Sequence, residues 1–132
     1  LIITKKNTEC IIVMREVSYK SSTALRIIDC IGNFSAIANI SSSLDKILLD
    51  ENHEYIDLLQ FGIDKQILYK AGFLEINDLN NLVIPDNFEP FEQKNKKIYF
   101  AFKNYNNETQ DYKITLFKGD GDQDRPNRVN SR

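Results

Sequence analysis

The residues that could carry chemistry in this sequence are a few acidic and aromatic side chains. Tyr55 and Asp57 are two positions apart in the segment 54–60, so they share one face if that segment is a strand. Tyr69 lies on a predicted short helix, three residues before Gly72. A carboxylate can bind an amine and a phenol can donate a proton, so we interpret these residues as candidates for substrate binding and acid chemistry. The alternative for Tyr69 is an ordinary aromatic side chain at the boundary of the core.

The turn Gly32-Asn33-Phe34-Ser35 is a second candidate site, because it connects a predicted strand to a predicted helix. Free backbone amides at such a turn can bind a phosphate group. The turn holds a single glycine, which favours the alternative of an ordinary helix N-cap made by Asn33 or Ser35.

The polar tail GDGDQDRPN carries Asp120, Asp122 and Asp124 at alternate positions, as in the first half of a calcium loop. Arg125 stands where that loop requires a glycine, and no glutamate follows at the twelfth position. We therefore predict no metal site. The three aspartates form either a solvated acidic turn or a set of carboxylates presented to a polar substrate or a partner chain.

Histidine and cysteine are too few for a zinc site of the usual kind. His53 lies between Asn52 and Glu54 and is predicted to be a solvated loop residue, with a general base as the alternative. Cys10 and Cys30 lie in apolar runs without C-x-x-C spacing. We predict that both are reduced core residues.

Composition excludes several classes of partner. The 132 residues fit one domain, and 17 Lys and Arg against 19 Asp and Glu leave no basic excess for nucleic acid. No run of 18 apolar residues is present, so we expect no membrane segment and a cytoplasmic protein. Because the chain begins at Leu1 inside an apolar run, we interpret it as a fragment with a domain at 1–118 and a polar tail at 119–132.

The elements that would position these residues follow from hydrophobic spacing. Apolar runs predict strands at 9–19, 24–31, 54–60, 73–77, 97–103 and 112–118. Apolar spacings of three and four predict a helix over 34–50, with a break at the serine run 41–43. Asp64 is predicted to cap a second helix, 65–71, which ends at Gly72. This order predicts an α/β (α+β) fold with a mixed, mostly antiparallel sheet and helices packed on it.

The stretch 64–73 (DKQILYKAGF) resembles the helix and its glycine-phenylalanine exit in the GNAT superfamily of acyl-CoA-dependent N-acyltransferases. The element order over 9–118 is similar to that family, without its first strand and two early helices. The resemblance implies that backbone amides at Gly32, Asn33 and Ser35 bind the pyrophosphate of acetyl-CoA or another acyl-CoA, although the family's spaced glycines are absent. It also implies that the splayed strands 24–31 and 54–60 orient the thioester, and that Tyr69 protonates the leaving thiolate.

Three functions remain open. The first is transfer of an acyl group to an amine of a small metabolite or amino sugar, bound by Tyr55, Asp57 and the three aspartates of the tail. The second is a non-catalytic GNAT-like half, or a binding module, that supports an N-terminal domain or forms a homodimer. The third is an unrelated α+β interaction domain that docks through Phe88 and Phe91 of the segment IPDNFEPF.

Overall fold

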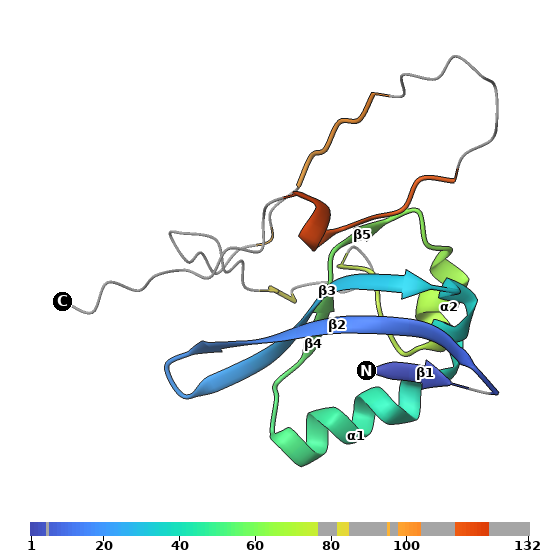
Figure 1. Cartoon of the computed structure of the whole chain (residues 1–132). Helices are drawn as coiled ribbons and strands as arrows, with labels where there is room; N and C mark the ends of the chain where they lie inside the picture. Colours follow the sequence, from blue (N-terminus) through green and yellow to red (C-terminus); the bar gives the residue numbers. More distant parts are fainter. Residues whose placement is uncertain (5, 77–81, 85–94, 96–97, 104–112, 122–132) are drawn as a thin grey trace.

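The computed structural model describes residues 1–4, 6–76, 82–84, 95, 98–103 and 113–121 (Figure 1). These residues form a mixed α+β fold with a mostly antiparallel sheet, which confirms the predicted fold class. A four-stranded sheet has the order β1-β2-β3-β4, and a two-stranded sheet pairs β5 with β6. No helix in the described part of the chain is long and apolar enough to cross a membrane.

The main sheet is built around a long hairpin. β2 (Thr8–Tyr19) and β3 (Ser22–Gly32) pair antiparallel across the turn at Lys20, which confirms the strands predicted at 9–19 and 24–31. β1 (Ile2–Thr4) pairs antiparallel with β2, whereas β4 (Ile56–Leu58) pairs parallel with β3. A parallel pair needs a crossover connection, and the helical segment between β3 and β4 supplies it.

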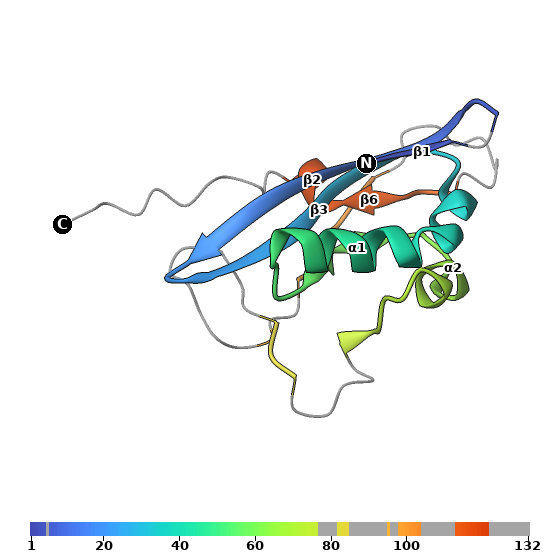
Figure 2. The same ribbon diagram turned by 90° about the horizontal axis from the view of Figure 1, so that it is seen from below.

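The crossover contains a short 3-10 helix, η1 (Phe34–Asn39), followed by α1 (Ser41–Glu51). The predicted helix over 34–50 is thus divided at Ile40, directly before the serine run that predicted a break. Asn33 caps η1, because its side chain accepts from the backbone N–H of Ser35 at 3.1 Å. Figure 2 shows α1 lying against one face of the sheet.

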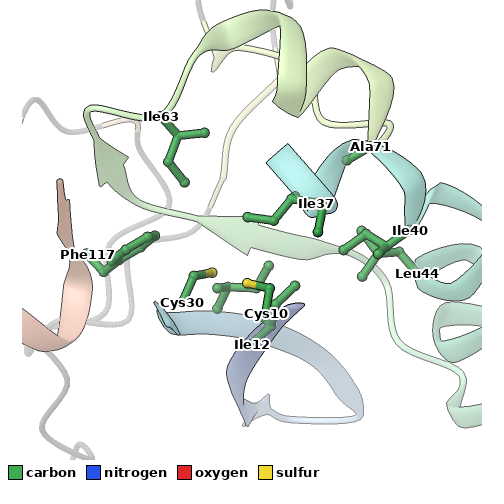
Figure 3. Close-up of a cluster of buried hydrophobic side chains, with 11 residues drawn as sticks. Cys10, Ile12, Cys30, Ile37, Ile40, Leu44, Ile63, Ala71 and Phe117 are labelled. Carbon is green, nitrogen blue, oxygen red and sulfur yellow. The ribbon is translucent and has the colours of Figure 1, made fainter. Parts of the chain in front are cut away.

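The core lies between the hairpin and this helical segment. Cys10 and Ile12 of β2, together with Ile27 and Cys30 of β3, pack against buried residues of η1 and α1 (Figure 3). Both cysteines are buried and free, which confirms the prediction of reduced core residues. On the hairpin's other face, exposed isoleucines are aligned across three strands, at positions 2, 11 and 31.

The predicted strand 54–60 is interrupted at Leu59, so that β4 is followed by a separate β5 (Gln60–Phe61). β5 pairs antiparallel with β6 (Leu116–Phe117), and β6 also contacts β3. The 3-10 helix η3 (Lys118–Gly121) then packs on β3. Buried Phe117 contacts Phe34 edge to face, with ring centroids 5.7 Å apart. β6 therefore connects β5, its hydrogen-bonded partner, to β3 of the main sheet.

The second helix, α2 (Lys65–Lys70), packs against η1. Asp64 accepts from the N–H of Gln66 at 2.8 Å, and Gly72 has a φ of 93°, so the predicted cap and the predicted left-handed exit are both confirmed.

Three further strand predictions were wrong in whole or in part. Residues 73–76 and 98–103 form no strand, and the strand predicted at 112–118 is reduced to β6. At the first of these, the N–H of Phe73 donates to the carbonyl of Leu68 at 3.0 Å and closes α2. An alternating pattern shows which face of a segment can be buried, but it supplies no partner strand.

Candidate functional site

A pocket of about 800 Å³ lies against β4, which is the edge strand of the main sheet. The pocket is lined on one side by residues 54–60 and on another by α2 and its exit. Most of its side chains are apolar, and Arg26 and Lys118 bring buried positive charge to it. From α2 and its exit the lining includes Lys65, Leu68, Tyr69 and 72–76. The other lining residues are 82–84, Asn95 and Ile98.

Three of the residues predicted to act on a substrate meet in this pocket. Tyr55 directly precedes β4, Asp57 is the middle residue of β4, and Tyr69 comes from α2. The pocket lining includes Ile56 and Leu58 as well as Tyr55 and Asp57, so every position of β4 contributes to it. Tyr69 reaches the same pocket because the turn between β5 and α2 brings the helix back toward β4.

Asp57 forms an ion pair with Arg26 on the neighbouring strand. The Nε of Arg26 donates to Oδ1 and Oδ2 of Asp57 at 2.9 and 3.0 Å, and its second guanidinium nitrogen donates to Oδ2 at 2.6 Å. The two side chains are 6% and 14% exposed. Two residues opposite each other in the β3–β4 register thus form a bidentate, nearly buried pair.

Sequence reasoning missed Arg26, although a signal was present. It is the only cation in the otherwise mostly apolar segment 24–31. A charge in a buried strand requires a partner of opposite charge, since an unpaired buried charge is strongly unfavourable. That requirement alone could have linked Arg26 to an acidic residue on an adjacent strand.

Tyr55 is half-buried beside this pair. Burial raises the pKa of its phenol, the Asp57 carboxylate raises it further, and the Arg26 guanidinium acts in the opposite direction. The phenol therefore keeps its proton at neutral pH and can donate a hydrogen bond. Tyr69 is more open to solvent, with 39% of its surface exposed.

The turn predicted to bind a cofactor lies outside the pocket lining. Asn33 accepts from both the N–H and the hydroxyl of Ser35, at 3.1 and 2.7 Å. The N–H of Asn33 donates to the carbonyl of Glu9, and the N–H of Ala36 donates to the carbonyl of Asn33. Gly32 has a φ of 116°, and a Cβ there would lie 2.4 Å from the Glu9 oxygen. The turn is thus a helix N-cap whose amides at 33, 35 and 36 already have acceptors.

The prediction of a solvated His53 was wrong. Its side chain is 0% exposed, and it links the hairpin to the end of α1. Nδ1 lies 2.9 Å from the hydroxyl of Thr23, and Nε2 lies 3.0 Å from a carboxylate oxygen of Glu51 and 3.8 Å from one of Glu16. The polar neighbours in sequence correctly indicated a loop, but the hairpin folds over that loop and buries the ring.

The acidic tail enters the described structure only at its start. Asp120 is exposed in η3, where its carboxylate accepts from the N–H of Phe117 at 2.7 Å and so closes a local turn. Asp122 and Asp124 lie outside the described residues, as do Phe88 and Phe91. Within the portion that the structure describes, no three His, Cys, Asp or Glu side chains are grouped so that they could hold a metal ion.

Comparisons with protein-family models, curated proteins and solved structures found no match to this chain.

Proposed function

We propose that this chain is a GNAT-like domain that binds a small amine-bearing molecule in the pocket against β4. The observation that carries the proposal is the convergence of Tyr55, Asp57 and Tyr69, all marked by sequence reasoning, on one pocket. Its volume of about 800 Å³ falls within the usual range for small-molecule sites, which are mostly apolar with a few placed polar groups.

Each polar residue has a distinct part in this proposal. Glu54 is exposed at the pocket and supplies a carboxylate for the ligand's amine. The protonated phenol of Tyr55 donates a hydrogen bond. Asp57 forms an ion pair with Arg26, so it contributes to the shape and the electrostatic field of the pocket wall instead of acting as an isolated anion. The apolar lining contacts the body of the ligand.

The geometry favours a binding module over an acyltransferase. A pyrophosphate does not fit the turn at Gly32, Asn33 and Ser35, because the amides that would bind it are engaged within the cap. β6, with buried Phe117, also pairs with β5 and contacts β3, so it lies beside the strands that the resemblance assigns to the thioester. We therefore derive no acyl-transfer step. Such a module would serve a neighbouring domain or a second copy of the chain.

Phenethylamine is a suitable probe, because it combines an amine with an apolar ring. At ten times its Kd, a ligand that binds only the folded state stabilises it by about 1.4 kcal/mol, or roughly 5 °C in Tm for a domain of this size. We expect that Glu54→Gln and Tyr55→Phe reduce this rise in Tm and that Tyr19→Phe, on the hairpin turn, does not. Phenethylamine at roughly 10 mM is concentrated enough to detect a millimolar Kd, so no rise in Tm at that concentration would overturn the proposal.

Acyl transfer from acetyl-CoA is the second candidate, because Tyr69 does line the pocket. Acetyl-CoA should raise the Tm and release free thiol with an amine acceptor if this candidate holds, and Tyr69→Phe should slow that release. No thiol release together with stabilisation by phenethylamine would leave the binding module as the function.

A further inference from the structure

Among the residues that the structure describes, the backbone of β4 has hydrogen-bond partners along one edge only. The N–H of Leu25 donates to the carbonyl of Tyr55 at 3.0 Å, and the parallel register places Leu25 opposite Ile56 and Ile27 opposite Leu58. Successive residues of a strand direct their backbone groups to opposite edges. Tyr55 and Asp57 therefore direct theirs to β3, whereas Ile56 and Leu58 direct theirs away from it.

Those outward groups border the pocket. Ile56 and Leu58 both line it and are half-buried, and no other described residue is hydrogen-bonded to their N–H or C=O groups. Backbone polar groups away from water are nearly always paired. The pocket therefore presents two backbone donors and two backbone acceptors with the spacing of a strand edge. A ligand with only an amine would leave most of these groups without a hydrogen-bond partner.

Charges at the two ends of β4 are complementary to the termini of a peptide. Glu54 precedes β4, and beyond its other end Lys118 directly follows Phe117, the β6 residue that pairs with Gln60. Both charged residues line the pocket. Five residue steps separate Glu54 from Leu59, about 17 Å at the rise of a strand, which matches a peptide of about five residues.

We propose that the ligand is a short extended peptide with free termini, which adds to the sheet as a strand parallel to β4. This inference rests on the proposed function and specifies its ligand class. Alternate amides of the peptide pair with Ile56 and Leu58, its terminal amine lies at Glu54, and its carboxylate lies toward Lys118. Strand addition of this kind takes affinity from main-chain hydrogen bonds and selectivity from the flanking side-chain contacts.

The peptide Ala-Val-Ala-Val-Ala and two N-methylated forms of it test this proposal. One form carries N-methyl groups at its second and fourth residues, and the other carries a single one at its third residue. Only one alternating set of amides can face β4, so we expect one methylated form to bind as the parent does and the other to lose at least tenfold in Kd. Equal Kd values for all three peptides would overturn strand addition.

Amide hydrogen exchange supplies the second measurement. Saturation with the parent peptide should slow exchange at Ile56 and Leu58 at least tenfold, with a much smaller change at Asp57, whose N–H already faces β3. Glu54→Gln should weaken the free peptide but leave its N-acetylated form unchanged. Binding of phenethylamine without the peptide would overturn this inference and leave the proposed function standing. Binding of neither would overturn both.

Discussion

Asp57→Asn removes the negative charge that balances Arg26 inside the protein. The guanidinium is 6% exposed and donates to the Asp57 carboxylate at 2.6, 2.9 and 3.0 Å. Breaking a buried pair by neutralising one partner costs about 3–5 kcal/mol, because the other charge loses the carboxylate that offsets its desolvation. The asparagine oxygen still accepts one hydrogen bond, so we expect a loss near the lower end, about 3 kcal/mol. For a domain of this size that lowers Tm by roughly 10 °C.

Urea unfolding followed by circular dichroism at pH 7 measures this loss in the free energy of unfolding. Asp45→Asn, on an exposed position of α1, is the matched control and should stay within about 0.5 kcal/mol of the parent. The double variant Arg26→Met/Asp57→Leu should regain most of the stability, since an apolar pair carries no desolvation cost. A loss below about 1 kcal/mol for Asp57→Asn, or a double variant no more stable than the single, would refute this reasoning.

Other predictions concern the ring of His53, the turn at Gly32 and the thiol of Cys30. His53→Ala should lower the free energy of unfolding by about 2–3 kcal/mol, because it leaves a cavity and unpaired polar partners; an effect under 0.5 kcal/mol would mean that the ring is solvated. Gly32→Ala should cost at least about 2 kcal/mol in urea unfolding, since its φ of 116° and the 2.4 Å approach to Glu9 exclude a side chain, whereas exposed Ser43→Ala should be near neutral. Burial raises the pKa of Cys30 from 9.0 to about 12, with Cys10 and Asp29 adding to the rise. The folded state then keeps a proton that the unfolded state loses, so this stabilisation is complete below pH 9 and is lost as the pH rises toward 12. Cys30→Ala should flatten the fall in stability over that range, and iodoacetamide at pH 8 should modify the parent's thiols far faster in urea than in the folded state.

Features set by neighbouring residues were predictable from the sequence. The hairpin follows from two apolar strands joined by a short polar segment. The caps at Asn33 and Asp64 follow from side chains that can accept from the first free amides of a helix. The end of α2 at Gly72 follows from the ease with which glycine adopts the left-handed conformation found just past a helix.

Features set by tertiary contacts were not predictable in this way. His53 is buried because the hairpin lies over it, and Asp57 is paired because β3 places Arg26 opposite to it in parallel register. The apolar residues at 73–76 and 98–103 have the alternation of strands, but a strand also requires a partner of matching register. No described residue pairs with the outer edge of β4 at Ile56 and Leu58, and this is a property of the sheet order, which hydrophobic spacing does not report.

A residue-by-residue map of amide chemical shifts during titration with phenethylamine tests the central claim most directly. We expect the shifted amides to cluster at residues 54–60 and 68–76, on the two sides of the pocket, and Tyr55→Phe to weaken the response. Shifts confined to residues 32–36, or spread over the surface without saturation, would contradict a binding site against β4.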